Sequence, residues 1–300
     1  MRAFFSDTYE LPLPPGHRFP SPKYKLLRER LVETGVLAAG ELEESDLIDR
    51  ASLLLAHTPE YVEAVFSGTL APAEQRRLGF PWSEGLVARS RASVQGTVAA
   101  ARAALRDGVA GNLAGGTHHA CAGNGSGYCV FNDIAVAART LQSEGAIDRA
   151  VVVDLDVHQG DGTAAIFEGD DSVFTFSMHG AKNFPFRKQR SSLDVDLPDG
   201  CADRDYLDAL DRHLPVALDR ARADILFFQA GVDPLEHDSL GRLKLTFSGL
   251  RERDRRVARA ARERGLPLVL TLGGGYARPI SLSVEAHAAT WSEARAVFGV

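Results

Sequence analysis

From about residue 111 onward, short apolar runs alternate along the chain with longer stretches in which apolar residues recur every three or four positions. Short runs rich in Val, Ile, Leu and Phe are typical of strands buried on both faces, and the longer stretches are typical of amphipathic helices. Strands are expected at 150–153, 173–176, 225–228 and 268–272, after a shorter run at 112–114. Helices are expected at 133–144, 203–221, 248–264 and 279–295. This alternation predicts an α/β fold with a central parallel sheet covered by helices on both faces.

The N-terminal third is expected to be helical, because start signals for helices recur in it. Ser21 and Thr58 each precede a proline, which suits a capping residue followed by the first residue inside a helix. Ser83 precedes a long stretch rich in Ala and Arg that ends near Gly108. This stretch predicts an amphipathic helix with a solvated basic face.

The chain shows no sign of a second domain, a membrane span or a signal peptide. Pro and Gly are spread evenly and no linker interrupts the 300 residues, so a single domain over residues 1–300 is expected. No apolar run approaches the roughly 18 to 20 residues of a membrane span. The three cysteines are odd in number and fit free thiols in the cytoplasm. The formal net charge of −6 argues against a nucleic-acid partner.

Polar or Gly-rich stretches follow the expected strands. In chain order they are GGTHHA, DLDVHQGDG, SMHG, QAGVDPLEHD and GGGY. In an open parallel sheet, ligands bind beyond the carboxyl ends of the strands. We therefore expect these stretches to converge on one edge of the sheet and to form the functional site there.

Three side chains in these stretches are candidate metal ligands. Asp156 and His158 are two positions apart just past a strand, and alternate residues of an extended chain point the same way. Asp233 occupies the matching end of a later strand. Two carboxylates and one imidazole leave a coordination position open for water and a carbonyl oxygen. The pattern predicts one metal ion, zinc, with ferrous iron as the alternative occupant.

His118 and His119 are neighbours in GGTHHA, so their side chains diverge in an extended segment and suit general acid–base work better than joint metal binding. Each imidazole then needs a partner on its far nitrogen, and Asp154 and Asp161 are the nearest unassigned carboxylates. Tyr276 ends GGGY, whose glycines allow a sharp turn that presents the phenol to the site. A phenol there can donate a hydrogen bond to an oxyanion.

These motifs together resemble those of zinc-dependent histone deacetylases, within the arginase/deacetylase superfamily. GGTHHA, GYCVFND, VVVDLDVHQGDGT, the Asp of AGVDPL and LGGGY occur in the order and spacing of that family. HTPEYV and HDSLGRLKLT look like it too, so the resemblance covers nearly the whole chain. GFPWSEGLVARS and GGGYARPI look most like the class IV branch and its bacterial relatives. The resemblance implies a deacetylase-like catalytic domain over residues 1–300.

The resemblance also implies roles for individual residues. Asp156, His158 and Asp233 would hold the zinc. Asp154 would orient His118, Asp161 would orient His119, and Tyr276 would polarise the scissile carbonyl. The residues beside the substrate would be Gly127, Tyr128 and Gly274. A structural potassium ion beneath the zinc would involve Asp154, Asp156, His158, Ser177 and Met178, several through backbone carbonyls.

The sequence departs from the family pattern at two places. The segment 180–192 does not match the Gly/Pro-rich segment of class I enzymes, so Phe184 or Phe186 would supply the second aromatic wall of the acyl channel. The alternative is that both rings merely anchor this segment on the core. Gln159 replaces the Asn that commonly follows the metal-binding His, a change expected to matter little.

The predicted function is zinc-dependent removal of an acyl group from the side-chain amine of lysine in a protein or peptide, with chains longer than acetyl accepted. An acetylpolyamine or another small acylated amine is the alternative substrate. A ureohydrolase is a more distant alternative, but a two-metal site needs more ligands and leaves the His pair unexplained. A non-catalytic acyl-lysine binder would lack a ligand, a histidine or the tyrosine, and all are present. The pattern does not indicate an oligomeric state.

Overall fold

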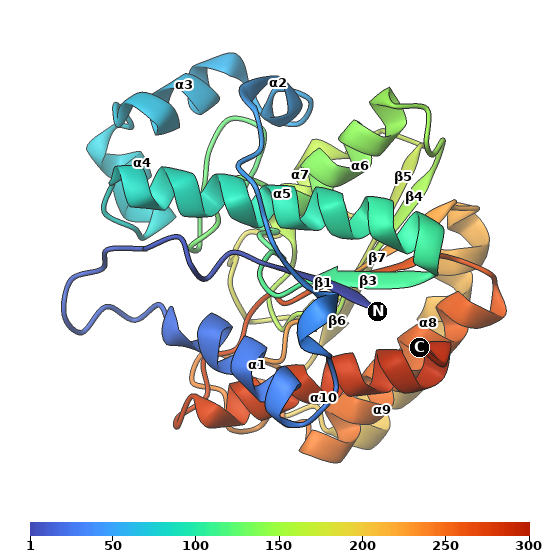
Figure 1. Ribbon diagram of the computed structural model, residues 1–300. Helices are drawn as coiled ribbons and strands as arrows, with labels where there is room; N and C mark the ends of the chain where they lie inside the picture. The colour runs from blue at the N-terminus through green and yellow to red at the C-terminus, as the bar shows by residue number, and fades with distance from the viewer.

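The computed structural model describes all 300 residues and contains one sheet of eight strands (Figure 1). The strands lie in the order β2-β1-β3-β8-β7-β4-β5-β6, and every neighbouring pair is parallel. Their bounds are β1 (Arg2–Phe5), β2 (Leu42–Glu44), β3 (Val109–Asn112), β4 (Ala150–Asp154), β5 (Val173–Gly180), β6 (Leu193–Leu197), β7 (Ile225–Gln229) and β8 (Leu268–Thr271). The predicted α/β fold with a parallel sheet is confirmed.

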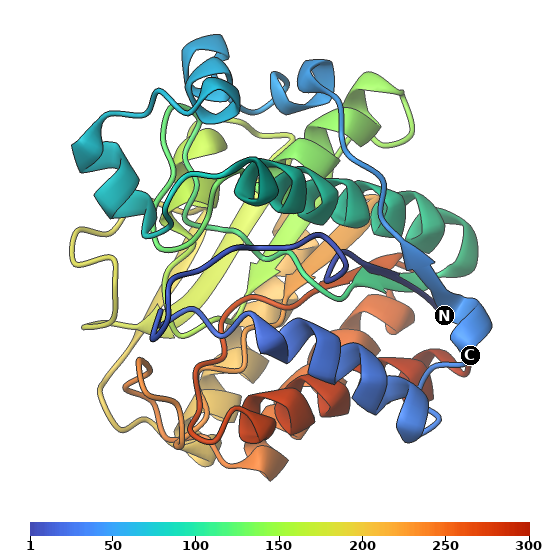
Figure 2. The same ribbon diagram turned by 60° about the vertical axis from the view of Figure 1, so that its left-hand side comes forward.

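Helices cover both faces of this sheet (Figure 2). One layer contains α2 (Arg50–Leu53), α3 (Pro59–Ser67), α4 (Pro72–Leu78), α5 (Glu84–Asp107), α6 (Asp133–Ser143) and α7 (Asp161–Ile166). The other contains α1 (Pro22–Glu33), α8 (Asp203–Ala221), α9 (Phe247–Glu263) and α10 (Ser281–Phe298), and a single 3-10 turn spans Ala39–Glu41. No helix in the structure combines the length and apolarity needed to cross a membrane.

The sheet separates two apolar cores, and β4 shows how its residues are divided between them. Val151 and Val153 belong to the core beneath α8, α9 and α10, whereas Ala150 and Val152 belong to the core beneath α5 and α6. Successive side chains of a strand point to opposite faces, so a strand in the middle of the sheet must be apolar throughout. Burial on both faces therefore explains the continuous apolar run on which the strand prediction rests.

The predicted helix starts are correct, although only two of the three are capped by a side chain. The Thr58 hydroxyl accepts a hydrogen bond from Tyr61 N at 3.4 Å, and the Ser83 hydroxyl accepts one from Leu86 N at 3.0 Å. Ser21 itself has helical backbone angles and makes no such bond, so the following proline alone marks that start.

The N-terminal third contains the five helices α1 to α5, in line with the helical prediction, but β1 and β2 lie there too and were not predicted. β1 has only four residues yet pairs with both β2 and β3.

The basic face expected along α5 is also partly covered. Arg89 packs over the Tyr24 ring at 4.8 Å, and Arg91 Nε donates to Ile48 O at 2.8 Å. Helix α1 and the segment before α2 thus cover arginines that helical periodicity assigns to solvent.

Candidate active site

The polar stretches after the strands meet at the carboxyl edge of the sheet, where they line a cavity of about 580 Å³. Its lining residues include His118 and His119 after β3, Asp156 and His158 after β4, and Tyr276 after β8. These strands lie in the middle of the sheet, with β7 between β8 and β4. The predicted convergence on one edge is therefore what the fold produces.

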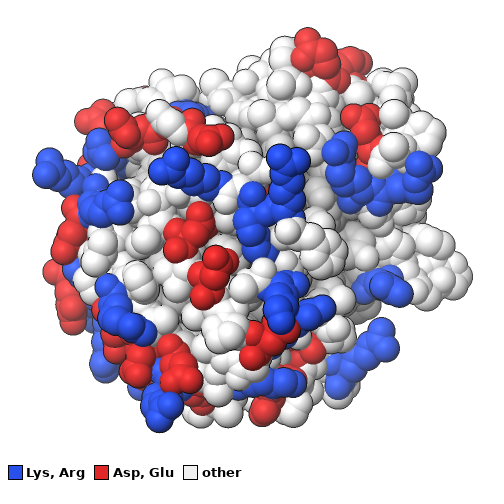
Figure 3. Space-filling view, turned by 180° about the vertical axis from the view of Figure 1, so that it is seen from behind, with Lys and Arg blue, Asp and Glu red and all other residues white.

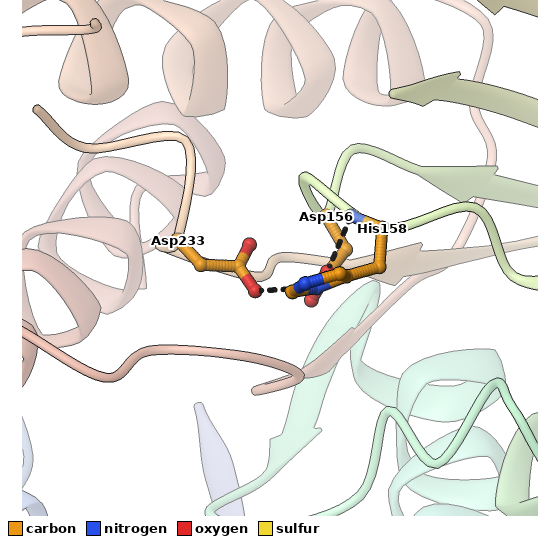
Figure 4. A group of neighbouring side chains, drawn as sticks. All are labelled: Asp156, His158 and Asp233. Atoms are coloured by element: carbon orange, nitrogen blue, oxygen red, sulfur yellow. Dashed lines mark hydrogen bonds and ion pairs between the residues drawn. The ribbon is translucent and has the colours of Figure 1, made fainter. Parts of the chain in front are cut away.

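Asp156, His158 and Asp233 form a buried cluster whose candidate ligand atoms all lie within 4.8 Å of one another. Figure 4 shows the three side chains pointing toward one another, two from the segment after β4 and one from the segment after β7. His158 Nδ1 lies 2.9 Å from Asp156 Oδ1 and 3.1 Å from Asp233 Oδ2. Burial and the nearby charge of Asp156 raise the pKa of Asp233 to about 7, because two carboxylates share one enclosed space.

The surroundings of this cluster fit a metal ion. Asp233 Oδ2 is buried and makes no hydrogen bond of good geometry, and the His158 ring nitrogen lies 3.1 Å from it. A Cβ on Gly231 would lie 2.1 Å from Asp156 Oδ2, and one on Gly274 would lie 1.9 Å from Asp233 Oδ2. The two glycines therefore form a cradle that a larger residue would fill. Two carboxylates and an imidazole are ligands that zinc accepts.

Each of the paired histidines has its own carboxylate partner. His118 Nδ1 lies 2.7 Å from Asp154 Oδ2, and His119 Nδ1 lies 2.6 Å from Asp161 Oδ1. Both rings are almost fully buried, and their centroids are 4.1 Å apart. A carboxylate on Nδ1 fixes the ring and leaves Nε2 as the nitrogen available for proton transfer.

The two imidazoles differ in pKa because their electrostatic surroundings differ. Burial disfavours the charged form of His118, but Asp154 and Asp156 outweigh it and raise the pKa of His118 to about 9. Burial and the neighbouring His118 lower the pKa of His119 to about 4. A cation beside Asp156 would offset part of that carboxylate's charge and lower the pKa of His118. At neutral pH, His119 is therefore the neutral ring that can accept a proton.

Unequal losses are expected when the two histidines are replaced by alanine. His119→Ala should lower turnover by about a hundredfold, and His118→Ala should lower it less, because only His119 is the base. Both variants should keep their metal. Turnover and metal content of the two purified proteins check this. A variant that loses its metal would show that the replaced histidine is a ligand.

Hydrogen bonds hold both the backbone N–H and the backbone carbonyl of Tyr276. Tyr276 N donates to Asp238 Oδ2 at 2.6 Å, and the Ser239 hydroxyl donates to Tyr276 O at 2.7 Å. In the preceding turn Gly273 has a φ of 66°, which favours glycine. Burial raises the pKa of the Tyr276 hydroxyl well above its usual value, so the phenol keeps its proton and remains a hydrogen-bond donor.

Gly127 and Tyr128 both line the cavity, and both have positive φ, 54° and 67°. Their amides donate to carbonyl oxygens of α4, from Gly127 N to Arg77 O at 3.2 Å and from Tyr128 N to Leu78 O at 2.9 Å. Phe184 lines the same cavity, and its ring centroid is 4.9 Å from that of His119. The side chain of Phe186 is 87% exposed. Of the two expected aromatics, Phe184 is therefore the one placed beside the catalytic candidates.

The remaining predicted residues lie around this cluster. Gly274 lines the cavity and donates its N–H to Asp156 Oδ2 at 2.8 Å, so it contacts a metal-ligand candidate as well. Asp154 is paired with Ser177 in the register of β4 and β5, with Met178 next along β5. The residues of the predicted potassium site thus lie at the end of β4, directly after it, and on the neighbouring part of β5.

Three further residues that support the site were not among the predicted ones. Gln229 Nε2 donates to Asp156 Oδ2 at 3.1 Å, and Asp133 accepts from Thr117 N at 2.7 Å. The buried Lys23 donates to Gly273 O at 3.1 Å, so an amine from α1 holds the turn before Tyr276. Gln229 and Asp133 belong to the motifs QAGVD and GYCVFND and carry a signal, whereas Lys23 looks like an ordinary surface lysine.

His57, from HTPEYV, ties the loops of the site together as a neutral ring. Its Nε2 accepts from Asn132 N at 2.9 Å, and its Nδ1 faces Cys121 O at 3.0 Å. Burial lowers the pKa of His57 to about 4. A protonated Nε2 could also no longer accept the Asn132 hydrogen bond, so protonation would disrupt this contact.

Acid is therefore expected to destabilise the fold through His57. Above pH about 6.5 the ring is neutral in both states, and as the pH falls from about 6.5 to about 4 the unfolded chain takes up the proton first. At about 1.4 kcal/mol for each pKa unit, the free energy of unfolding should fall by about 3 kcal/mol over this pH range. Urea unfolding of His57→Gln and the parent between those pH values measures it. Equal pH dependence of the two proteins would contradict this.

A model of the histone deacetylase domain matches residues 17–291 of this chain. The chain belongs to the histone deacetylase family. This family member is 32% identical to histone deacetylase 2 of Arabidopsis thaliana over 290 residues, covering 90% of this chain and 73% of that protein. It is 48% identical to an uncharacterised protein of Picosynechococcus sp. over 294 residues, which cover 98% of both chains. It is thus a hydrolase of the histone deacetylase family.

More distant matches to this histone deacetylase family member come from sequence and from solved structures. The acetoin utilization protein AcuC of Staphylococcus aureus is 27% identical over 258 residues, covering 79% of this chain and 66% of that protein. A histone deacetylase homologue from Aquifex aeolicus has a TM-score of 0.83 at 23% identity, covering 99% of this chain and 88% of that one. A homologue complexed with SAHA has a TM-score of 0.84 at 24% identity, covering 100% of this chain and 84% of that one.

Proposed function

We propose that this hydrolase removes acyl groups from the side-chain amine of acyl-lysine in a protein or peptide, and that it uses zinc. One observation carries the proposal: Asp156 and His158 of the buried Asp-His-Asp cluster line the same cavity as a histidine pair with carboxylate partners and a tyrosine. The cluster alone would fit many metal proteins. The histidines and the phenol beside it favour hydrolysis of an amide.

Asp156, His158 and Asp233 would hold the zinc, and ferrous iron is the alternative occupant. When bound, the ion would supply Lewis-acid chemistry, polarising the carbonyl and lowering the pKa of a water molecule toward about 7. Potassium would lie close by, among the oxygens of Asp154, Asp156, His158, Ser177 and Met178. These assignments rest on the chemistry of the donor set and on the family.

The other residues of the cavity would carry out the proton transfers. His119 accepts the proton of the attacking water through Nε2 and returns it to the leaving amine, while Asp161 holds its ring. His118 adds electrostatic assistance, and the Tyr276 hydroxyl donates a hydrogen bond to the oxyanion. The walls formed by Tyr128 and Phe184 orient the lysine chain and exclude water.

The expected substrate is an acyl-lysine peptide, with chains longer than acetyl accepted. Apolar residues from the N-terminal segment and α5, namely Leu11, Phe19 and Leu86, line the same cavity as the histidines. Each buried CH₂ contributes about 0.8 kcal/mol, or about fourfold in affinity. The test is kcat/KM of the zinc-loaded protein for one peptide carrying acetyl, butyryl, octanoyl or myristoyl lysine, with acetylated polyamines alongside and the chelated protein as control.

The outcomes of this series separate the alternatives. A rate constant that stays level or rises with chain length supports the proposal. An optimum confined to acetyl would show that the apolar lining does not hold the acyl chain. Activity on polyamines alone would identify a small-amine deacetylase instead. No hydrolysis of any compound by the metal-loaded protein would refute the function as a whole.

A further inference from the structure

We propose that the site selects acyl-lysines flanked by acidic residues. The inference rests on the proposed function and specifies the peptide that carries the acyl group. It starts from a contrast in charge: the chain has 34 Lys and Arg against 40 Asp and Glu, yet its cavity has the opposite balance. The basic residues that line the cavity are Arg76, Arg77, Arg89, Lys182 and Arg242, and the only acidic one is Asp156, a metal-ligand candidate.

One flank of the cavity mouth is formed by α4. Arg76 and Arg77 are exposed there, and neither has a carboxylate within ion-pair distance, so their charges are uncompensated. Arg77 O accepts the hydrogen bond from Gly127 N at 3.2 Å, which places this arginine one backbone contact from the substrate channel. Two unpaired guanidinium groups therefore stand beside the Tyr128 wall.

The other flank lies beside Phe184. Lys182 and Arg242 are exposed there and share a single carboxylate, that of Asp199, at 3.9 Å and 3.2 Å. One negative charge against two positive charges leaves this flank positive. Asn183 Nδ2 donates to Leu240 O at 2.9 Å and joins the two segments that carry the cations. On the right-hand side of Figure 3, Lys and Arg side chains border a hollow, and few Asp or Glu side chains lie among them.

An extended acidic peptide fits this arrangement better than a small anion. The cations lie on two sides of the channel, so residues before and after the acyl-lysine can each meet one flank. Phe186 is 87% exposed and Leu240 is 42% exposed at the same mouth, so apolar neighbours of the lysine can pack there. A polyamine or a basic flanking sequence would bring positive charge toward positive charge.

The test uses the zinc-loaded protein and three peptides of equal length, in which the same acyl-lysine is flanked by Glu, Gln or Lys. At about 50 mM salt, kcat/KM should be at least about tenfold higher for the Glu peptide than for the Lys peptide, mainly through KM. At about 500 mM salt the ratio should shrink, because the Debye length falls well below its value of about 10 Å at 0.1 M.

Variants of the mouth show where the selection arises. Arg76→Gln with Arg77→Gln, and separately Lys182→Gln with Arg242→Gln, should each reduce the Glu-over-Lys ratio severalfold. The matched control is Arg106→Gln with Arg259→Gln, an equal charge change at exposed residues that do not line the cavity, and it should leave the ratio unchanged. The inference is overturned, while the proposed function stands, if the three peptides are cleaved equally, if the Lys peptide is preferred, or if the mouth variants leave the ratio unchanged. No cleavage of any peptide overturns the proposed function and this inference with it.

Discussion

Asp233→Ala is expected to abolish both metal binding and hydrolysis. The variant retains only Asp156 and His158 of the buried cluster and loses the carboxylate that also accepts a hydrogen bond from Val157 N at 2.8 Å. Removing one of three ligands leaves an incomplete site, so activity should fall by at least about a thousandfold. The measurements are metal content per chain and turnover of parent and variant, with about one transition-metal ion per chain expected in the parent.

A control separates metal loss from unfolding. Asp211→Ala removes an exposed carboxylate of α8, which pairs with Arg256 at 2.8 Å, and should change neither metal content nor turnover. If Asp233→Ala retains its metal and remains active, Asp233 is not a ligand. If the parent holds a bridged pair of manganese ions, the ureohydrolase alternative becomes the better description.

Tyr276→Phe should lower turnover by about 10²–10³ while the metal stays bound, because a donor to the oxyanion is lost and no ligand is touched. The substitution removes one oxygen from a ring whose backbone is held by Asp238 and Ser239. The phenylalanine ring should therefore keep its place. Steady-state kinetics and metal analysis of the purified variant measure both effects.

Tyr9→Phe is the matched control for this change. Its hydroxyl donates to Ser45 O at 3.0 Å and does not line the cavity, so its loss should leave turnover unaltered. Near-normal turnover of Tyr276→Phe with zinc bound would remove the phenol from the mechanism. A loss of metal in that variant would mean that the tyrosine supports the site mechanically.

The middle of the sheet could be predicted because burial on both faces leaves a continuous apolar run. β4 and β7 are fully buried and were recognisable for that reason, whereas β2 and β6 are edge strands with partly exposed, charged residues. Edge strands take their structure from the neighbour with which they pair. β6 has the sequence LDVDL, which carries no such apolar run, so its pairing with β5 could not be inferred.

The candidate site was predictable where chemistry and local geometry coincide. Asp156 and His158 come directly after β4, so their place at the edge of the sheet follows from that strand, although they lie in a bend and not in the extended chain that the prediction assumed. Lys23 could not be found in this way, because its role depends on α1 packing beside a turn 250 residues away. Arg77 is a similar case: its helix has the periodicity of any surface helix, and only the contact with Gly127 brings it to the channel.

The order of the strands bears on how the protein opens. β3, β8, β7 and β4 are consecutive in the interior of the sheet, and each precedes a segment of the candidate site, whereas the edges are β2 and β6. Fraying begins where backbone amides lack a neighbour on one side, and buried central strands exchange their amide hydrogens last. The catalytic candidates are therefore attached to the part of the sheet that exchanges most slowly. Transient opening of the edge strands β2 and β6 should leave their relative positions unchanged.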